Sequence, residues 1–142
     1  MTHLDSHADT CVVGCNSLVV HDFDRPVDVC GFDPTGPVSK SLRTVSAAVA
    51  YTIPTTGEVV MLVIHQAVLI PSLSHNLLCP NQLRLNDVAI SEQPKFLTDR
   101  PTDETHTIMI PGNDDDDLPP LTIPLDLKGL TSVFPTHKPT IQ

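Results

Sequence analysis

Residues 4–10 read Leu4-Asp5-Ser6-His7-Ala8-Asp9-Thr10 and lie close to the N-terminus. They place an apolar residue, an Asp-Ser pair and a second acidic residue in the frame hydrophobic–Asp–Ser/Thr–x–Ala–Asp–Thr. An apolar run, residues 11–13, follows directly and favours a β-strand. Far along the chain, residues 67–83 form a second marked segment, in which aliphatic residues surround two prolines. These two segments carry most of what the sequence says about fold and function.

The first segment resembles the active-site turn of retroviral and retrotransposon aspartic proteases, which have glycine where this chain has His7. The resemblance implies that Asp5 is the catalytic carboxyl and that Ser6 hydrogen-bonds across the turn of a partner copy. It places His7 in the same catalytic turn. It further implies that Ala8 and Asp9 bind substrate, with Asp9 contacting the substrate backbone.

An aspartic protease uses two carboxyls that share one proton: one activates a water molecule and the other polarises the carbonyl of the peptide bond. This chain has a single Asp-Ser motif of this kind, so the resemblance implies a homodimer in which Asp5 faces Asp5 of a second copy. The implied substrate is a polypeptide, the retroelement's own polyprotein, and the reaction needs no cofactor. The start of the chain lacks the charged and apolar regions of a signal peptide. We therefore expect an intracellular location, in the cytoplasm or in a retroelement particle.

The second segment contains Asn76-Leu77-Leu78-Cys79-Pro80-Asn81-Gln82-Leu83. It is similar to the Asn-Leu-Leu-Ser-x-x-Gln-Leu pattern of copia-type retrotransposon proteases. The resemblance implies that Leu77 and Leu78 pack beneath the catalytic turn. It also implies an arginine that pairs with the second Asp of the motif, a role open to Arg84 for Asp9. Because proline suits the first position of a helix, we expect one short helix over residues 80–86.

His7 is the departure from the family pattern. Glycine fits there because the turn packs closely against its symmetry mate and the substrate. Three readings remain open. The turn works as a modified active site, or it is catalytically silent and the domain serves assembly, or its histidines join the carboxylates in a metal-binding or pH-sensing site.

The metal-binding reading rests on the alternation of His3, Asp5, His7 and Asp9. On an extended strand these four side chains point to one face, and imidazoles with carboxylates suit zinc. Neighbouring ligands would stand about 6.5 to 7 Å apart along a strand, too far to share one ion without a bend. We treat this set as the minor alternative and expect no metal in the main reading.

Composition limits the class of protein. The chain has 142 residues, 14 prolines, no Trp and a net charge of −9. The acidic balance argues against a nucleic-acid partner, which requires a basic patch. No apolar run reaches the roughly 20 residues of a membrane span. Prolines interrupt helices, whereas the many Val, Ile and Thr residues favour strands. Composition therefore favours an all-β chain, and the resemblance implies a closed antiparallel retropepsin-like barrel. We expect a single domain over residues 1–142 with an extended tail over 135–142.

The clearest local element is a β-hairpin. Residues 42–53 and 58–69 are rich in apolar residues, read as strands and flank the turn Pro54-Thr55-Thr56-Gly57. The continuous apolar run in the second strand indicates burial on both faces. A flap covering the active-site cleft, implied by the resemblance, is expected within residues 30–45. The four cysteines match no zinc framework and are expected to be free thiols.

Overall fold

The computed structural model describes residues 1–5, 9–30, 38–113, 115 and 118–140, with the side chains of residues 29–30 and 38–40 excepted. In chain order the elements are β1 (Thr2–Leu4), β2 (Val12–Val13), β3 (Leu18–Asp22), β4 (Val27–Cys30), β5 (Val38–Leu42), β6 (Thr44–Thr52), β7 (Val59–Leu69), β8 (Asn76–Leu78), α1 (Pro80–Arg84), β9 (Ala89–Ile90), the short 3-10 helix η1 (Lys95–Leu97), β10 (Thr107–Ile110), β11 (Leu121–Pro124), β12 (Asp126–Lys128) and β13 (Thr131–Phe134). The predicted all-β class is confirmed.

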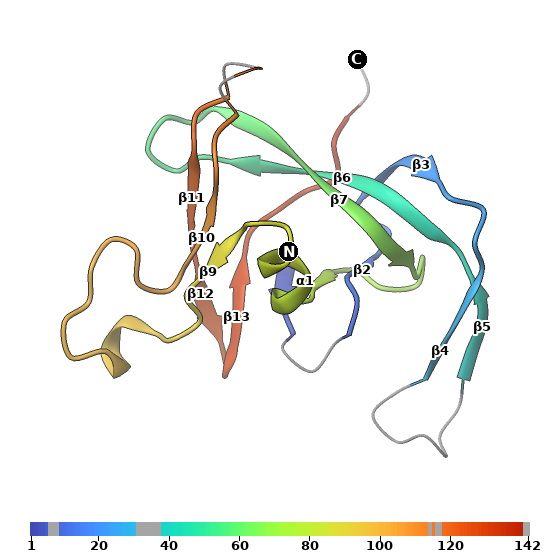
Figure 1. Ribbon diagram of the computed structural model, residues 1–142, viewed down its shortest axis with the longest axis horizontal. Helices are drawn as coiled ribbons and strands as arrows, with labels where there is room; N and C mark the ends of the chain where they lie inside the picture. Colours follow the sequence, from blue (N-terminus) through green and yellow to red (C-terminus); the bar gives the residue numbers. More distant parts are fainter. Residues whose placement is uncertain (6–8, 31–37, 114, 116–117, 141–142) are drawn as a thin grey trace.

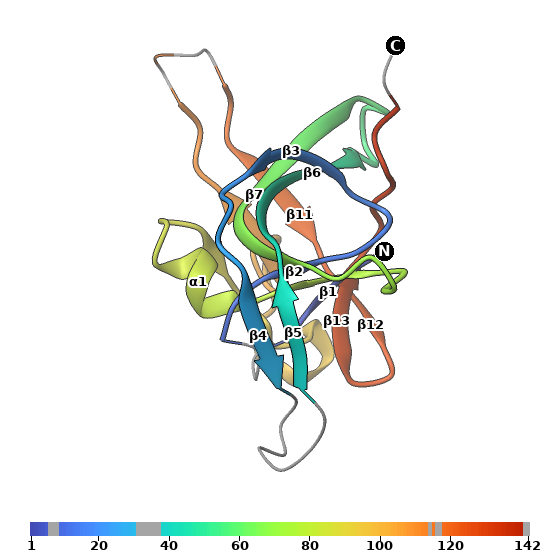
Figure 2. The ribbon, with the colours of Figure 1, turned by 90° about the vertical axis from the view of Figure 1, so that its right-hand side faces the viewer.

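The strands form three sheets. The largest has the order β12-β13-β1-β8-β2-β7-β6-β3, the second is β11-β10-β9 and the third is the hairpin β4-β5. Figures 1 and 2 show β6 and β7 curving over β1, β2 and α1, with the β4–β5 hairpin reaching down from the ends of β3 and β6. The two smaller sheets stand at opposite ends of the large one in Figure 1.

The predicted closed, antiparallel barrel is not what the described residues form. Two pairs in the large sheet, β1 with β8 and β2 with β7, run parallel because long connections return the chain in the same direction. In the described part of the chain no pairing joins the outer strands β3 and β12. Exposed charged residues, Asp22 on β3 and Asp126 and Lys128 on β12, disfavour further pairing at these edges.

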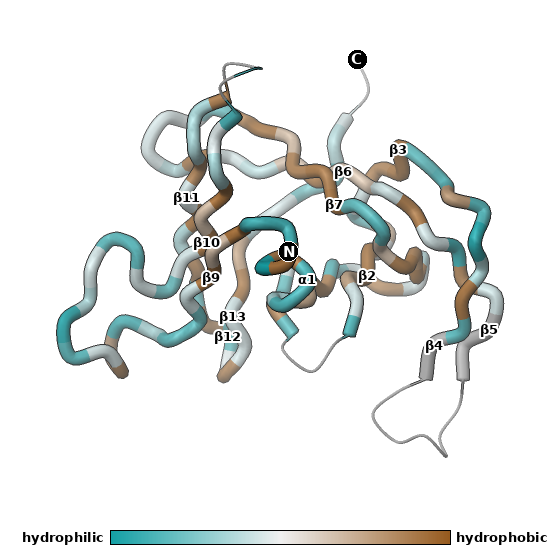
Figure 3. The backbone as a smooth tube through the Cα atoms, in the orientation of Figure 1, coloured by the Kyte–Doolittle hydropathy of each residue, from teal (hydrophilic) through white to brown (hydrophobic). Residues whose placement is uncertain are grey.

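The β6–β7 hairpin is confirmed and forms the largest antiparallel pair, running from Thr52 opposite Val59 to Thr44 opposite Val68. The burial prediction for its second strand is wrong. It is β6 that is buried on both faces, whereas β7 alternates and leaves Val59, Met61 and Val63 exposed. The apolar colouring of β7 in Figure 3 therefore includes a solvent-facing side.

The core lies between the large sheet and the β9–β11 sheet. Its largest fully buried side chains include Tyr51 of β6 and Phe134 of β13, whose rings meet edge to face with centroids 6.0 Å apart. The segment after β13 stays extended and attached to the sheet. His137 and Ala50 exchange two backbone hydrogen bonds of 2.8 and 3.0 Å, and Pro139 is buried.

Strands β4 and β5 pair antiparallel. Of this pair, β5 lies within residues 30–45, the range in which a flap was expected, whereas β4 reaches that range only at its last residue, Cys30. Residues 31–37, which connect them, lie outside the described residues. Asp28 accepts a hydrogen bond of 2.9 Å from the backbone N–H of Ser41 through Oδ1. The register of the pair shifts between Val27 and Val29, which marks a β-bulge or irregularity.

His106 makes the fold sensitive to pH. It is buried, and its Nε2 lies 2.8 Å from Ser132 Oγ. Burial lowers the pKa of His106 below the usual histidine value; Asp126 opposes the shift and Lys95 adds to it. The unfolded chain then binds the proton more readily than the fold does. Stability is therefore complete above about pH 6.5 and falls as pH drops through the lowered pKa of the folded state.

We expect His106→Asn to flatten the dependence of unfolding free energy on pH below about 6.5. Asparagine tolerates the left-handed backbone of this position, where φ is 58°. Urea unfolding between about pH 5 and 8 measures the effect. The control His137→Asn changes an exposed side chain and should leave the slope as in the wild type. An equal slope in all three proteins would contradict the role of His106.

Candidate active site

Asp5 and Asp9 belong to the connection between β1 and β2, two strands of the large sheet that β8 separates. Asp5 follows β1, is half-buried, and donates its backbone N–H to the carbonyl of Leu78 at 3.0 Å. Asp9 is exposed and leads through Thr10 into β2. The predicted site residues Ser6, His7 and Ala8 lie outside the described residues. The structure therefore places Asp5 and Asp9 from the predicted set.

Strand β8 lies between β1 and β2, so it passes between the two limbs of the turn. Leu4 stands opposite Leu78 in the parallel β1–β8 pair, and Val12 stands opposite Leu77 in the antiparallel β2–β8 pair. Leu78 is buried and Leu77 is half-buried. The aliphatic pair of the second segment thus lies between the strand that precedes Asp5 and the strand that follows Asp9.

Asn76, the first residue of β8, stabilises this arrangement through the hydrogen bonds of its side chain. Its side chain is fully buried, and its Oδ1 accepts the backbone N–H of Gly14 at 2.9 Å. Its Nδ2 donates to Thr2 Oγ1 at 3.3 Å, and Thr2 Oγ1 lies 2.7 Å from Thr136 Oγ1. Strands β1, β2 and β8 and the C-terminal segment are therefore joined through one carboxamide.

The short helix after β8 is confirmed, over Pro80–Arg84, with the proline in the first turn. Its Gln82 faces the exit limb of the turn. Gln82 Oε1 accepts the backbone N–H of Cys11 at 2.8 Å and lies 3.4 Å from Thr10 Oγ1. Gln82 Nε2 reaches the carbonyl of His65 at 3.5 Å. The helix is thus linked by side-chain hydrogen bonds both to the turn and to β7.

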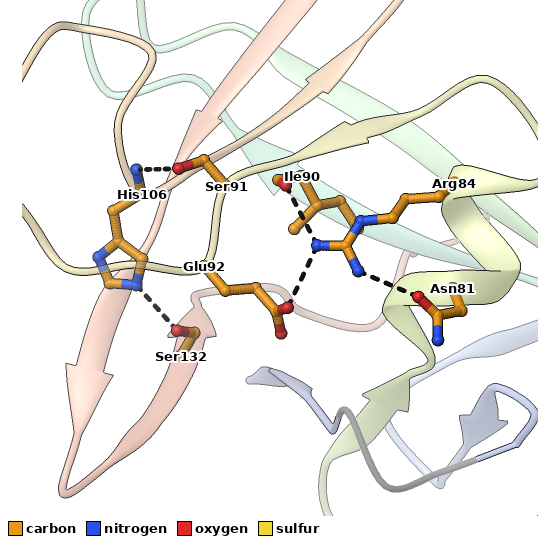
Figure 4. A network of polar contacts seen from close by, with 7 residues as sticks. All are labelled: Asn81, Arg84, Ile90, Ser91, Glu92, His106 and Ser132. Carbon is orange, nitrogen blue, oxygen red and sulfur yellow. Dashed lines mark hydrogen bonds and ion pairs between the residues drawn. The ribbon is translucent and has the colours of Figure 1, made fainter.

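The expected pairing of Arg84 with Asp9 is wrong. Figure 4 shows the guanidinium of Arg84 directed at Asn81, Ile90 and Glu92. Its guanidinium donates to Asn81 Oδ1 at 3.1 Å and to the carbonyl of Ile90 at 3.2 Å, and it pairs with Glu92 at 3.2 Å. These three acceptors, which lie close to Arg84 in the chain, occupy the guanidinium.

Cys11 and Cys79 lie in contact beneath the turn. The backbone N–H of Cys79 donates to Cys11 Sγ at 3.2 Å, and both residues are buried. Burial raises the pKa of the Cys11 thiol to about 11, so the sulfur stays protonated and is a poor nucleophile. Cys11, Cys15 and Cys79 are free, as predicted; the side chain of Cys30 lies outside the description.

His3 packs against another histidine and belongs to no metal-binding group among the described residues. Its ring stacks on His75, with centroids 4.4 Å apart. Burial lowers the pKa of His3, and His75, Lys128 and the terminal amine add to the shift. Among the described residues no group of three or more His, Cys, Asp or Glu is placed to hold a metal ion. His7, the fourth member of the alternating set, lies outside this description.

An apolar cavity of about 240 Å³ lies beneath β7 and borders the site through Leu78 and Leu83. Apart from Thr2 and Met61, its other lining residues are aliphatic or aromatic. It contains no ionisable side chain, so it offers no acid–base chemistry.

Sequence reasoning missed two residues that hold the turn, Asn76 and Gln82. Both residues are part of the pattern that the second segment matches, but the pattern does not indicate which groups their side chains bind. Carboxamide acceptors have no characteristic spacing, since the groups they bind are backbone N–H groups far away in sequence.

In comparisons with known proteins, the chain matches no family model, no curated protein and no solved structure. Within the described residues, no helix has both the length and the apolar character needed to cross a membrane.

Proposed function

We propose that the chain is a retropepsin-like aspartic endopeptidase of retroelement origin that works as a homodimer. Each copy contributes Asp5, and the two carboxyls share the proton that peptide hydrolysis requires. The substrate is the polyprotein of the element. The reaction uses water and the two carboxyls, without a cofactor.

One observation carries this proposal. The two segments that resemble the family are far apart in sequence, yet β8 lies between β1 and β2, and Leu78 accepts the N–H of Asp5. A chance match of two short patterns gives no reason for the second to support the first. The common placement of both segments is what a built catalytic turn requires.

Two further features support a protease. The hairpin of β4 and β5 overlaps residues 30–45, the range expected for a flap, through all of β5 and the last residue of β4. A flap is the element that covers a bound peptide. The half-buried Asp5 is next to a rigid scaffold, because β1 is paired on both sides, with β13 and with β8. A catalytic carboxyl on such a scaffold keeps its geometry through the reaction.

The proposal is tested by incubating the purified domain with a polyprotein segment that contains its own flanking sequences. We expect cleavage that pepstatin blocks, and sedimentation should show a dimer under the same conditions. Active protein that stays monomeric would contradict the shared site. A stable dimer without cleavage would instead favour the catalytically silent reading.

His7 is the residue by which the chain departs from its relatives, and we expect it to set the pH profile. A protonated imidazole beside the carboxyls would favour their ionised form. Two such imidazoles would also repel across the two-fold axis. Activity or the dimer constant should therefore change between about pH 6 and 7, where histidine titrates.

We expect His7→Gly to remove this change and to move the optimum to lower pH. The control His7→Gln keeps a side chain of similar size that cannot be charged, so it separates loss of charge from relief of crowding. Cleavage rates and sedimentation from about pH 4 to 8 give the result. If both variants keep the wild-type profile, the imidazole has no part in the site. If His7→Gly instead releases a bound metal together with activity, the metal-binding reading is correct.

A further inference from the structure

The exit limb of the turn depends on a single side-chain acceptor. The backbone N–H of Cys11 points to Gln82 Oε1 at 2.8 Å, and the same oxygen lies 3.4 Å from Thr10 Oγ1. Cys11 is almost fully buried, with 1% of its surface exposed. Without Gln82 its N–H would be a buried donor with no acceptor, which is costly. The carboxamide therefore satisfies the N–H of Cys11, while the carbonyl of Cys11 accepts the N–H of Val68 at 2.9 Å, and the two bonds together set where the chain enters β2.

The entry limb is held from the same short segment. Leu78 accepts the N–H of Asp5, and four residues later Gln82 accepts the N–H of Cys11. Between these two points, the segment is set by the pairing of β8 and by the proline-started helix α1. The separation of the two limbs is thus defined by a rigid element of five residues.

The charge of this acceptor matters as well as its position. The turn already carries Asp5 and Asp9. A glutamate at position 82 would offer the same acceptor but would bring a third negative charge to the turn. A carboxamide accepts the hydrogen bond without that charge, and its Nε2 can also donate to His65 O.

We propose that Gln82 is a positioning residue for the catalytic turn: its side-chain oxygen sets the exit limb relative to the entry limb, which Leu78 holds, and so sets the placement of Asp9 relative to Asp5. This inference rests on the proposed function. It assigns to Gln82 no contact with substrate or with the reacting atoms.

The test compares three variants of the full chain. Gln82→Leu removes the acceptor, and Gln82→Glu keeps it and adds charge. Gln93→Leu is the matched control, since Gln93 donates to the carbonyl of Leu97 in the loop after α1. The readouts are kcat and KM for the polyprotein segment, the pH profile, and hydrogen exchange at the Cys11 amide.

For Gln82→Leu we expect kcat to fall by about 10- to 100-fold with KM changed less than about threefold, because misplaced reacting groups lower the rate of the chemical step. Exchange at the Cys11 amide should rise by about tenfold or more, because its acceptor is lost. Gln82→Glu should restore amide protection and most of kcat, with the pH profile moved to higher pH, because an added negative charge holds the shared proton more tightly. Gln93→Leu should match the wild type in all readouts.

If Gln82→Leu exchanges faster at the Cys11 amide but keeps its kcat, the positioning role is overturned. The Gln82–Cys11 hydrogen bond then serves only the structure. Unchanged exchange would show that the bond itself is absent. Should Gln82→Leu fail to fold, Gln82→Glu decides: a wild-type pH profile in that variant overturns the proposal. A wild-type protein that cleaves nothing refutes the proposed function separately, and the exchange measurement then decides the Gln82–Cys11 bond by itself.

Discussion

Asp5→Asn is expected to abolish cleavage while leaving the fold intact. Asparagine has nearly the same shape as aspartate but can neither share the catalytic proton nor activate water as a base. Loss of one essential group should lower kcat by about 10⁴-fold or more, a loss of about 5 kcal/mol in transition-state stabilisation. The backbone bond from Asp5 to Leu78 does not depend on the side chain, so β1 and β8 should stay paired.

The measurement is cleavage of the polyprotein segment, with circular dichroism and urea unfolding as checks on folding. Asp99→Asn is the matched control, because Asp99 is exposed in a loop and the same chemical change there should be silent. Cleavage by Asp5→Asn at the wild-type rate would end the aspartic-protease reading.

Mixing the same variant with wild-type protein tests directly whether the active site is shared between two copies. If each copy supplies one carboxyl, an excess of Asp5→Asn protein should capture wild-type chains in mixed dimers with one catalytic Asp. Activity of a fixed amount of wild type should then fall as the variant is added, whereas added Asp99→Asn should increase it. If the Asp5 variant does not inhibit, the active site is contained in one chain and the shared-site account is wrong.

Local signals in the sequence predicted the local elements well. The turn at residues 54–57 fixed the β6–β7 hairpin, and Gly57 there takes the left-handed φ of 73° that such turns favour. Pro80 marked the start of α1. In each case the determining residues are neighbours in the chain, so the physical cause is visible in a short window of sequence.

Non-local features were harder to predict. The alternation of exposure along β7 was missed because Val59, Met61 and Val63 are as apolar as the residues that face the core, so the pattern does not show which face is covered. The antiparallel barrel failed because nothing in β8 itself specifies that it enters between β1 and β2. Arg84 was offered as a partner for Asp9 although its position does not match that of the family's arginine, and it binds Glu92 and the carbonyl of Ile90 instead. The candidate site was predictable as a motif and as a neighbourhood, but not in its hydrogen bonds.

Gly14→Ala is expected to be the most destabilising single methyl addition near the site. Gly14 ends β2 and is buried against the loop before β8, where a Cβ would collide with the carbonyl oxygen of Leu73 and lie 3.0 Å from that of His75. Both obstacles are backbone atoms, and the Leu73 carbonyl already accepts the N–H of Cys15. The loop must therefore move as a whole, at a cost of about 3 kcal/mol or more.

The movement should reach the active site, because Asn76 follows this loop directly and binds the N–H of Gly14. Displacing the loop from β2 draws β8 away from the limbs of the turn, so activity should fall together with stability. The control is Gly129→Ala in the β12–β13 turn, where a Cβ meets open space and the only strain is a left-handed φ of 65°, worth about 1 kcal/mol. Urea unfolding and cleavage assays on both variants measure the difference. If Gly14→Ala is no less stable than Gly129→Ala, the close approach of the loop to β2 is wrong, and with it the support of the turn by β8.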